Sequence, residues 1–369
     1  MTKERVAVAM SGGVDSSVAA ALLTEQGYEV VGLTMCFGLA DYPGRKPRCC
    51  GRQGIEDARR VAHRLGIRHY VLNMRQALEG FVIDDFCSEY LRGRTPNPCV
   101  RCNHYLKFGL LLNKALSLGA EYLATGHYAR IIRTQDSGPR TQKYRLAKAK
   151  DKHKDQSYFL YRLTQGQLRH ILFPLGNYTK IEVRALARKF GLSVADKPGS
   201  QEICFLPENN YRAFLKSRVK GGLRPGLILD REGKVLGRHQ GAAYYTIGQR
   251  EGLGVALGYP AYVVKINPRA GRIFLGPREE AMAREFLLKS PRFAGLPCRQ
   301  AGKDFKKKVA VQVKIRYNHK PAAAKLLAHK DKIKVIFKRP QFAVTPGQAA
   351  VFYDRNIVLG GGIIDEVLK

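Results

Sequence analysis

The sequence has few acidic residues and no long apolar segment. Only 30 of its 369 residues are Asp or Glu, against 64 Lys or Arg, which leaves a formal net charge of +34. This excess of positive charge favours a large polyanion as partner, either a nucleic acid or an acidic membrane surface. No run approaches the roughly 20 apolar residues that span a bilayer, and residues 1–13 lack the long apolar core of a signal peptide. We therefore expect a cytoplasmic protein without a membrane partner.

Cysteine is also sparse, and its spacing is irregular. The eight cysteines occupy positions 36, 49, 50, 87, 99, 102, 204 and 298. This pattern excludes a disulfide-stapled scaffold, so in a reducing compartment the cysteines are thiols, metal ligands or nucleophiles. The length instead allows two or three domains with a sizeable buried core.

The first two hundred residues alternate between apolar runs of strand length and segments of helical periodicity. Strands are predicted at residues 6–10, 28–35, 68–74 and 121–131, and helices at residues 16–26, 55–65 and 103–118. Such alternation is typical of an α/β fold with a doubly wound parallel sheet. Ligands of these sheets bind beyond the carboxyl ends of the strands.

A Gly-rich turn, AMSGGVDS at residues 9–16, joins the first predicted strand to the first predicted helix. Paired glycines let the backbone approach a ligand closely, and the free N–H groups of a helix N-terminus favour a phosphate. The turn is not a Walker loop, because the lysine of GxxxxGK[ST] is missing. A bare SGG also fits an ordinary strand-to-helix turn, whereas the full SGGVDSS is much more specific.

SGGVDSS resembles the PP-loop of the ATP pyrophosphatase superfamily, whose members use ATP to adenylate a carbonyl oxygen and release pyrophosphate. Further segments restrict the resemblance to one family within this superfamily. These segments are GRTPNPCVRCNHYLKFG (93–109), ATGHYAR (124–130), DKHKDQSYFLYRL (151–163), GSQEICFLP (199–207), YYTIGQREGLG (244–254) and VTPGQAAVFYD (344–354). Together they resemble the tRNA-specific 2-thiouridylases over nearly the whole chain. Members of this family replace the 2-oxygen of the wobble uridine of tRNA with sulfur.

The resemblance implies binding sites for ATP and for tRNA. ATP is expected at Ala9, Met10, Ser11, Gly12, Gly13, Val14, Asp15, Ser16, Met35 and Gly126. Mg²⁺ is expected with it, because the pyrophosphate leaving group carries concentrated negative charge. The target uridine, flipped out of the anticodon stack, is expected to contact Asn97, Pro98 and Cys99. Further tRNA contacts are implied for His127, Lys154, Asp155, Gln156, Arg316, Tyr317 and Gln348.

Cys99 and Cys102 form a CxxC motif on a Pro-rich loop ahead of a predicted helix. A partly exposed thiol beside a helix N-terminus and Arg101 is expected to have a lowered pKa. Half of a structural zinc site is the alternative. The only other close pair, Cys49 and Cys50, has poor geometry for a shared tetrahedral ion, and we leave it unassigned.

Cys204 lies between Ile and Phe, where an isolated cysteine is most often a buried core residue. The resemblance instead implies that Cys204 carries the incoming sulfur as a persulfide, with Cys102 as the partner nucleophile. Attack of one sulfur on the other then leaves a disulfide. The expected sulfur donor is a cysteine desulfurase or a sulfur-relay protein.

Cys99 departs from the family pattern. Many members have Asp at this position, and that Asp is assigned a proton-transfer role near the target base. The substitution puts Cys99, Cys102 and Cys204 in one site, and three thiolates can hold an iron–sulfur cluster with one iron left open. Persulfide transfer and cluster-bound sulfide therefore both remain open. Cys36, Cys87 and Cys298 are interpreted as packing residues.

The second half of the chain has short β-prone runs between Gly-rich turns. We predict a PP-loop catalytic domain at residues 1–205, a β-rich central domain at 206–280 and a C-terminal β-barrel at 281–369. Residues 303–339 hold thirteen Lys or Arg and only two acidic residues. Most such runs are solvated surface, but beside a nucleotide-activating domain they favour binding of the RNA backbone.

Two other functions would share part of this pattern. A PP-loop ligase or amidotransferase acting on a small molecule would keep SGGVDSS but would not need the basic barrel or the cysteines. A non-catalytic RNA-binding protein would keep the charge but would have no use for an ATP loop. We therefore expect a tRNA-uridine 2-sulfurtransferase.

Overall fold

The computed structural model describes residues 3–38, 52–134, 144–199, 203–206, 208, 210–219, 222–293 and 309–368. Cys49, Cys50, Cys298 and residues 303–308 of the basic segment lie outside the described residues. The chain forms two units. The first comprises Met1–Val82, Cys99–Asn209 and Asn356–Val358, and the second comprises Ile83–Pro98, Asn210–Arg355 and Leu359–Lys369.

The first unit contains a parallel sheet with the strand order β3-β2-β1-β4-β7. Its strands are β1 (Arg5–Ala9), β2 (Glu29–Cys36), β3 (Arg68–Asn73), β4 (Tyr122–Thr125) and β7 (Ile171–Leu172). The middle of β1 is fully buried, as expected for a strand covered on both faces. The strand order reverses between β1 and β4, so their carboxyl ends form the switch point of the sheet. The predicted doubly wound α/β fold is confirmed.

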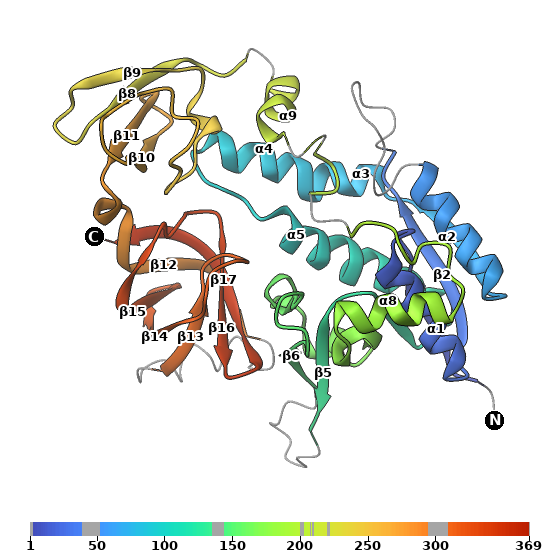
Figure 1. Cartoon of the computed structure of the whole chain (residues 1–369). Helices are drawn as coiled ribbons and strands as arrows, with labels where there is room; N and C mark the ends of the chain where they lie inside the picture. The colour runs from blue at the N-terminus through green and yellow to red at the C-terminus, as the bar shows by residue number, and fades with distance from the viewer. Residues whose placement is uncertain are drawn as a thin grey trace. The chain divides into compact units, whose positions relative to one another are not determined.

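Three helices share one hydrophobic cluster with β1, namely α1 (Val14–Glu25), α2 (Arg52–Arg64) and α8 (Lys180–Lys189). Nine of the twelve residues of α1 are buried, and they are mostly Ala, Ser, Val and Leu, which allow close packing against α8 (Figure 1). Helix α8 begins with a capping box, in which Thr179 and Glu182 satisfy each other's backbone N–H groups. The start of α8 is therefore fixed relative to α1.

The other α-helices are α3 (Arg75–Leu78), α4 (Asp84–Leu91), α5 (Pro98–Arg101), α6 (Leu112–Ser117), α7 (Gln165–Leu168) and α9 (Tyr211–Arg218). Short 3₁₀ segments are η4 (Ser157–Leu160), η5 (Pro174–Asn177), η7 (Ala242–Tyr244) and η8 (Arg278–Ala281). Two π-helical segments are η2 (Glu79–Ile83) and η3 (Cys102–Leu111). No helix within the described residues is long and apolar enough to cross a bilayer.

The cysteine motif lies inside a helix rather than on a loop ahead of one. Helices α5, η3 and α6 follow one another without interruption, so the helix predicted from residue 103 begins at Pro98. Proline suits this first position, because its missing N–H would have no partner there. Cys99 therefore lies in the first turn, and Cys102 begins the π-helical segment, a kind of distortion that often marks functional sites.

The strand predicted at residues 121–131 is two strands in different sheets. Strand β4 ends at Thr125, and β5 (Ala129–Arg133) pairs with β6 (Tyr144–Lys148) as an antiparallel hairpin. The break falls at Gly126, whose backbone packs against the start of α1. The continuous apolar pattern conceals this break, because both strands are partly buried.

The second unit contains two β-structures with separate cores. A central sheet has the order β10-β11-β8-β9, with β8 (Gly226–Leu229), β9 (Val235–His239), β10 (Tyr262–Asn267) and β11 (Arg272–Gly276). Its core includes Ile228, Val263 and Ile273. This arrangement confirms the predicted β-rich central part of the chain.

Six strands at the C-terminal end close into an antiparallel barrel, drawn in orange to red in Figure 1. They are β12 (Met282–Phe293), β13 (Val309–Lys314), β14 (Ala322–His329), β15 (Lys332–Phe342), β16 (Ala349–Asp354) and β17 (Ile357–Leu368). The barrel closes through pairing of β12 with β17. Phe286, Phe337 and Phe352 fill its interior, and the predicted barrel is confirmed.

We expect Phe337→Ala to lower the free energy of unfolding of the second unit by about 3–5 kcal/mol, because a fully buried ring is replaced by a cavity. Chemical denaturation monitored by circular dichroism measures the change. Val235→Ala is the control, since Val235 is exposed and its loss should cost less than about 0.5 kcal/mol. Equal effects of the two substitutions would contradict the described barrel core.

Candidate active site

The loop after β1 is shaped by two glycines and three serine hydroxyls. Gly12 has φ +70°, and a Cβ there would lie 2.1 Å from the carbonyl oxygen of Gly54. The Ser16 and Ser17 hydroxyls donate to the Gly13 carbonyl at 3.1 and 2.9 Å, and the Ser16 oxygen accepts from the Ser11 N–H at 3.2 Å. Gly13 is the N-cap of α1 and provides no side-chain cap. The positive end of α1 therefore lies beside a loop that only glycine can form.

The loop after β4 meets this first loop at the switch point. A Cβ on Gly126 would lie 2.7 Å from the Asp15 carbonyl carbon and from the Ser16 nitrogen, so only glycine fits. Met35 lies near the carboxyl end of the adjacent strand β2. The structure thus brings the predicted nucleotide residues 9–16 and Gly126 together at one edge of the sheet, with Met35 on that edge. ATP binding by these residues remains a prediction.

Two lysines from distant segments supply the positive charge that the sequence motif lacks. Lys180 Nζ donates to Asp15 Oδ1 at 2.6 Å. Lys197 Nζ donates to the Gly12 carbonyl at 2.9 Å and to Asp57 Oδ2 at 2.5 Å. Sequence reasoning missed both lysines, because they lie more than 160 residues beyond their partners in the loop. The only local signal for Lys180 is the capping box that begins α8.

Asp57 holds Lys197 from a buried position on α2. Burial raises the pKa of this carboxyl, but hydrogen bonds from Lys197, Arg60 and Gln53 outweigh that effect and lower the pKa below its ordinary value. Asp57 therefore remains ionised at neutral pH. The ammonium of Lys197 is fixed beside the loop by this charge.

Tyr128 connects the nucleotide loop to the predicted tRNA-contacting segment at 151–157. Its hydroxyl donates to Asp15 Oδ1 at 2.7 Å, and its backbone N–H donates to Gln156 Oε1 at 3.0 Å. Burial, and then the charge of Asp15, raise the pKa of Tyr128, so the phenol stays protonated. The Lys180 backbone N–H donates to Asp151 at 3.0 Å, which closes the ring of contacts. A displacement of Asp15 would therefore disturb the hydrogen bonds that hold the 151–157 segment.

Asp155, one of the predicted tRNA contacts, is buried. The carboxylate accepts hydrogen bonds from Ala149 N–H at 3.1 Å, Ser157 N–H at 3.2 Å and the Ser157 hydroxyl at 2.9 Å. These bonds use the side chain to hold the loop in shape. Lys154 is partly exposed, so its side chain can still reach a phosphate. The alternating charges of DKHKDQ do not show which side chain holds the loop and which one reaches the solvent.

Cys99 and Cys102 are partly exposed and form no disulfide, but their pKa values move opposite to the expected direction. Burial, and then the neighbouring Cys102, raise the pKa of Cys99 to about 11, although Lys107 opposes the rise. Burial also raises the pKa of Cys102, again opposed by Lys107. Desolvation by the surrounding chain outweighs the helix N-terminus, so both thiols are protonated at neutral pH.

His127 follows β4 and is buried beside Lys107. Lys107 Nζ lies 3.4 Å from His127 Nε2, and His127 Nδ1 lies 2.7 Å from the Thr125 hydroxyl. An ammonium can only donate, so Nε2 accepts and the ring proton is on Nδ1. Burial, and then Lys107, lower the pKa of His127 well below its ordinary range. The predicted RNA contact at His127 is thus a neutral imidazole held next to a cation.

The structure does not assemble a metal cluster from the described cysteines. Cys99, Cys102 and Cys204 are all described, and no group of three His, Cys, Asp or Glu side chains in the described ranges is placed to hold a metal ion. Cys204 is partly exposed and is not in a disulfide. Cys36 and Cys87 are also partly exposed thiols rather than fully buried packing residues.

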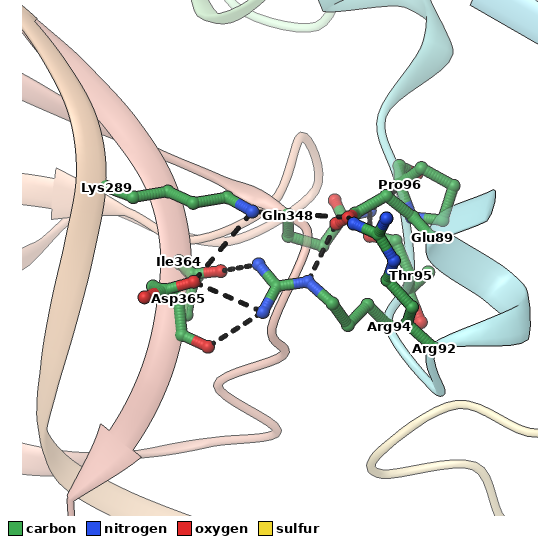
Figure 2. A network of polar contacts seen from close by, with 9 residues as sticks. All are labelled: Glu89, Arg92, Arg94, Thr95, Pro96, Lys289, Gln348, Ile364 and Asp365. Carbon is green, nitrogen blue, oxygen red and sulfur yellow. Dashed lines mark hydrogen bonds and ion pairs between the residues drawn. The ribbon is translucent and has the colours of Figure 1, made fainter. Parts of the chain in front are cut away.

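The segment 93–98, which we call the strap, leads from α4 to the cysteine motif and carries Asn97 and Pro98. Figure 2 shows Arg94 between the carboxylates of Glu89 and Asp365. Its Nε donates to Glu89 at 2.7 Å, and Nη1 lies 3.3 Å from the Asp365 carboxylate and 3.0 Å from its carbonyl oxygen. The strap is therefore attached to strand β17 of the barrel through a buried, hydrogen-bonded charge network.

Gln348, a predicted tRNA contact, donates instead to the strap. Its Nε2 lies 3.0 Å from the Thr95 carbonyl oxygen and 3.1 Å from that of Pro96 (Figure 2). The Thr95 N–H in turn donates to the Pro346 carbonyl at 2.9 Å. Gln348 thus satisfies backbone carbonyls that an extended segment cannot satisfy itself.

The described part of the basic segment has both paired and solvent-facing cations. Lys332 pairs with Asp365 and Lys334 with Glu285, each at 2.6 Å. Arg316 donates to the carbonyls of residues 342 and 343, and Lys314 lies over the Tyr317 ring at 5.4 Å. Other cations are exposed, and they are Lys320, Lys325, Lys330, Lys338 and Arg339. The segment therefore keeps exposed positive charge, while another part of its charge is used within the unit.

Comparison with known proteins defines the class that this fold and site represent. Residues 4–208 match a family described as "tRNA methyl transferase HUP domain", residues 212–277 its "PRC-barrel domain", and residues 284–364 an "aminomethyltransferase beta-barrel domain". The chain is therefore a HUP-domain protein with a PRC-barrel and a C-terminal barrel.

Curated relatives narrow this class over the full length. A tRNA-specific 2-thiouridylase MnmA of Carboxydothermus hydrogenoformans is 52% identical, covering 99% of each chain. Its counterpart in Halothermothrix orenii is 50% identical, covering 98% of this chain and 99% of that protein, and that of Acetivibrio thermocellus is 48% identical over 99% and 100%. The chain belongs to the tRNA-specific 2-thiouridylase family.

We expect alkylation of Cys99 by iodoacetamide to be slow at neutral pH, because its raised pKa leaves the thiol protonated. The rate should rise about tenfold per pH unit without a plateau up to about pH 9.5, where a free thiol already levels off. Peptide mass mapping measures it, with glutathione as the reference. A rate equal to that of glutathione at neutral pH would show that the pKa of Cys99 is not raised.

Proposed function

We propose that this protein catalyses the ATP-dependent 2-thiolation of the wobble uridine of tRNA. The observation that carries the proposal is the geometry of the nucleotide loop. At the switch point of the sheet, two glycines pack closely against neighbouring backbone, and two lysines donate hydrogen bonds to the loop. Membership of the 2-thiouridylase family supplies the substrate class. The basic barrel supports an RNA partner.

The loop suits the triphosphate of ATP. Gly12 and Gly126 let the loop pack closely against Gly54 and the start of α1, and the N-terminus of α1 favours the phosphates. Lys180 and Lys197 are held by carboxylates and can turn to the phosphates when ATP arrives. Asp15 is then free to take part in holding Mg²⁺. We assign the ATP contacts to residues 9–16, Met35 and Gly126.

The chemistry begins with attack of the uridine 2-oxygen on the α-phosphorus, which releases pyrophosphate. The terminal sulfur of a Cys204 persulfide then attacks C2, and AMP leaves with the former 2-oxygen. Cys102, as thiolate, attacks Cys204 Sγ, breaks the S–S bond and leaves 2-thiouridine and a Cys102–Cys204 disulfide. A thiol reductant must restore both cysteines before the next turnover. Asn97, Pro98 and Cys99 are assigned to the target base.

Protonated thiols fit the first stage of this sequence. At rest, Cys102 cannot attack prematurely, because burial keeps its pKa raised. Lys107 is the cation on the same helix that favours its ionisation. Deprotonation is therefore assigned to the stage after tRNA and ATP have bound.

Cluster-bound sulfide is the second mechanism that Cys99 allows, with Cys99, Cys102 and Cys204 as iron ligands. It requires the three thiolates to come together from the positions described above. Iron content and visible absorption after anaerobic purification distinguish the two mechanisms. If the wild type contains no iron and is as active in air as Cys99→Asp, the cluster mechanism is excluded and direct persulfide transfer remains. The donor is proposed to be a cysteine desulfurase or a sulfur-relay protein.

The decisive assay combines the protein with ATP, Mg²⁺, unmodified tRNA and a persulfide donor, namely a cysteine desulfurase with cysteine. Mass spectrometry of the digested nucleosides should detect 2-thiouridine only when ATP is present. RNA binding without any modified nucleoside would support a non-catalytic role.

Cys102→Ser and Cys204→Ser should each reduce thiolation at least about 1,000-fold, because a hydroxyl cannot replace the covalent step of a thiol. Binding of tRNA should change less than about twofold, since affinity comes mainly from backbone phosphates. Thiolation is followed by mass spectrometry and binding by filter retention, with Cys36→Ser as the control. Activity retained by either variant would remove that cysteine from the mechanism.

Lys197→Met should slow pyrophosphate release by about 10- to 100-fold, because one cation beside the phosphates is lost. Its fold should survive, since Asp57 keeps hydrogen bonds from Arg60 and Gln53. An enzyme-coupled pyrophosphate assay measures the rate. Lys189→Met, an exposed lysine at the end of α8, is the matched control. Equal rates in the two variants would rule out a phosphate contact at Lys197.

A further inference from the structure

We propose that Arg94 and Gln348 are positioning residues that set the geometry of the target-base contacts through the strap. The inference rests on the proposed function, because it concerns how Asn97 and Pro98 are presented to the uridine. Neither Arg94 nor Gln348 needs to touch tRNA for this role. They act by fixing the backbone that precedes Asn97 and Pro98.

Arg94 fixes the start of the strap. Besides its bonds to Glu89 and Asp365, its Nη2 donates to the Ile364 carbonyl at 2.9 Å (Figure 2). Only 15% of the Arg94 side chain and 9% of the Glu89 side chain are exposed. A rigid guanidinium fork that joins two carboxylates and two carbonyls defines a direction as well as a charge, which lysine cannot reproduce.

Gly93 lets the chain turn from α4 into the strap. It has φ +69°, and a Cβ there would lie 3.0 Å from Ile266 and 3.2 Å from Pro268. The Arg94 N–H donates back to the Glu89 carbonyl at 2.9 Å, as at a glycine-terminated helix end. The guanidinium and the backbone of Arg94 are therefore both tied to Glu89.

The middle of the strap is fixed by the turn before β16. Gln348 donates to the carbonyls of Thr95 and Pro96, and the Thr95 hydroxyl donates to Thr246 at 3.0 Å. Gly347 approaches so closely that a Cβ on it would lie 2.8 Å from the Thr95 carbonyl oxygen. Both backbone polar groups of Thr95 are thus bonded to the turn before β16.

Through this arrangement, Arg94 and Gln348 affect the thiolation rate although neither takes part in the chemistry. Pro96 is held immediately before Asn97 and Pro98, so a loosened strap lets the base contacts shift. A misplacement of about 1 Å between reacting groups costs about 100-fold in rate. Phosphate contacts made elsewhere on the protein would be unaffected. The two residues should therefore govern turnover rather than tRNA affinity.

The test measures the single-turnover thiolation rate at saturating ATP and tRNA, and the Kd for tRNA, in Gln348→Met and Gln348→Glu. We expect Gln348→Met to lower the rate about 10-fold and Gln348→Glu about 100-fold, because a carboxylate repels the two carbonyls that the amide binds. The Kd should stay within about twofold of wild type in both. A loss that appears in the Kd alone would show that Gln348 contacts tRNA directly and would overturn the proposal.

Arg94→Lys keeps the charge but loses the fork, and we expect it to behave like Gln348→Met. The matched control is Arg92→Met, because the Arg92 side chain is 67% exposed and its ion pair within the described residues is a long one, 3.6 Å from Glu89. Melting temperatures show which variants remain folded, and Gln348→Met decides the matter if Arg94→Lys does not fold. Wild-type rates in Gln348→Met would overturn the proposal. Absence of thiolation by wild type would refute the proposed function itself.

Discussion

Close backbone packing around the loop after β1 is the constraint on which the rest of the first unit depends. Gly12 lies against Gly54, and Gly126 lies against Asp15 and Ser16, with no room for a Cβ at either glycine. These contacts fix the N-terminus of α1 at the switch point of the sheet. They also force β4 to end at Thr125, which separates the sheet from the β5–β6 hairpin. The shape of the loop after β1 and the end of β4 thus involve the same packing.

Charge is distributed so that each functional segment is held by buried or half-buried pairs. Asp57 holds Lys197, and Asp15 holds Lys180. In the second unit, Glu89 and Asp365 hold Arg94. Breaking such a pair leaves an uncompensated charge, which is costly in a partly desolvated setting. Some of the few acidic residues of the chain therefore serve to position cations, while the large excess of Lys and Arg favours a polyanion as partner.

The sequence predicted the fold class and the nucleotide loop because both depend on local patterns. Apolar runs such as RVAVA and the glycines of SGGVDSS carry their structural consequences within a few residues. Lys197 was not predictable, because its role depends on a contact with Gly12 across 185 residues. The burial of Asp155 and the raised pKa of Cys99 were missed for a similar reason, since desolvation depends on the packing of distant segments.

The central claim is that the uridine 2-oxygen is activated by adenylation and leaves with AMP. It is tested most directly with tRNA whose wobble uridine carries a heavy oxygen isotope at the 2-position. After one turnover with ATP and a persulfide donor, the account predicts that the heavy isotope appears in AMP, with one label for each 2-thiouridine formed. Labelled oxygen in water or pyrophosphate, with unlabelled AMP, would contradict adenylation of the uridine.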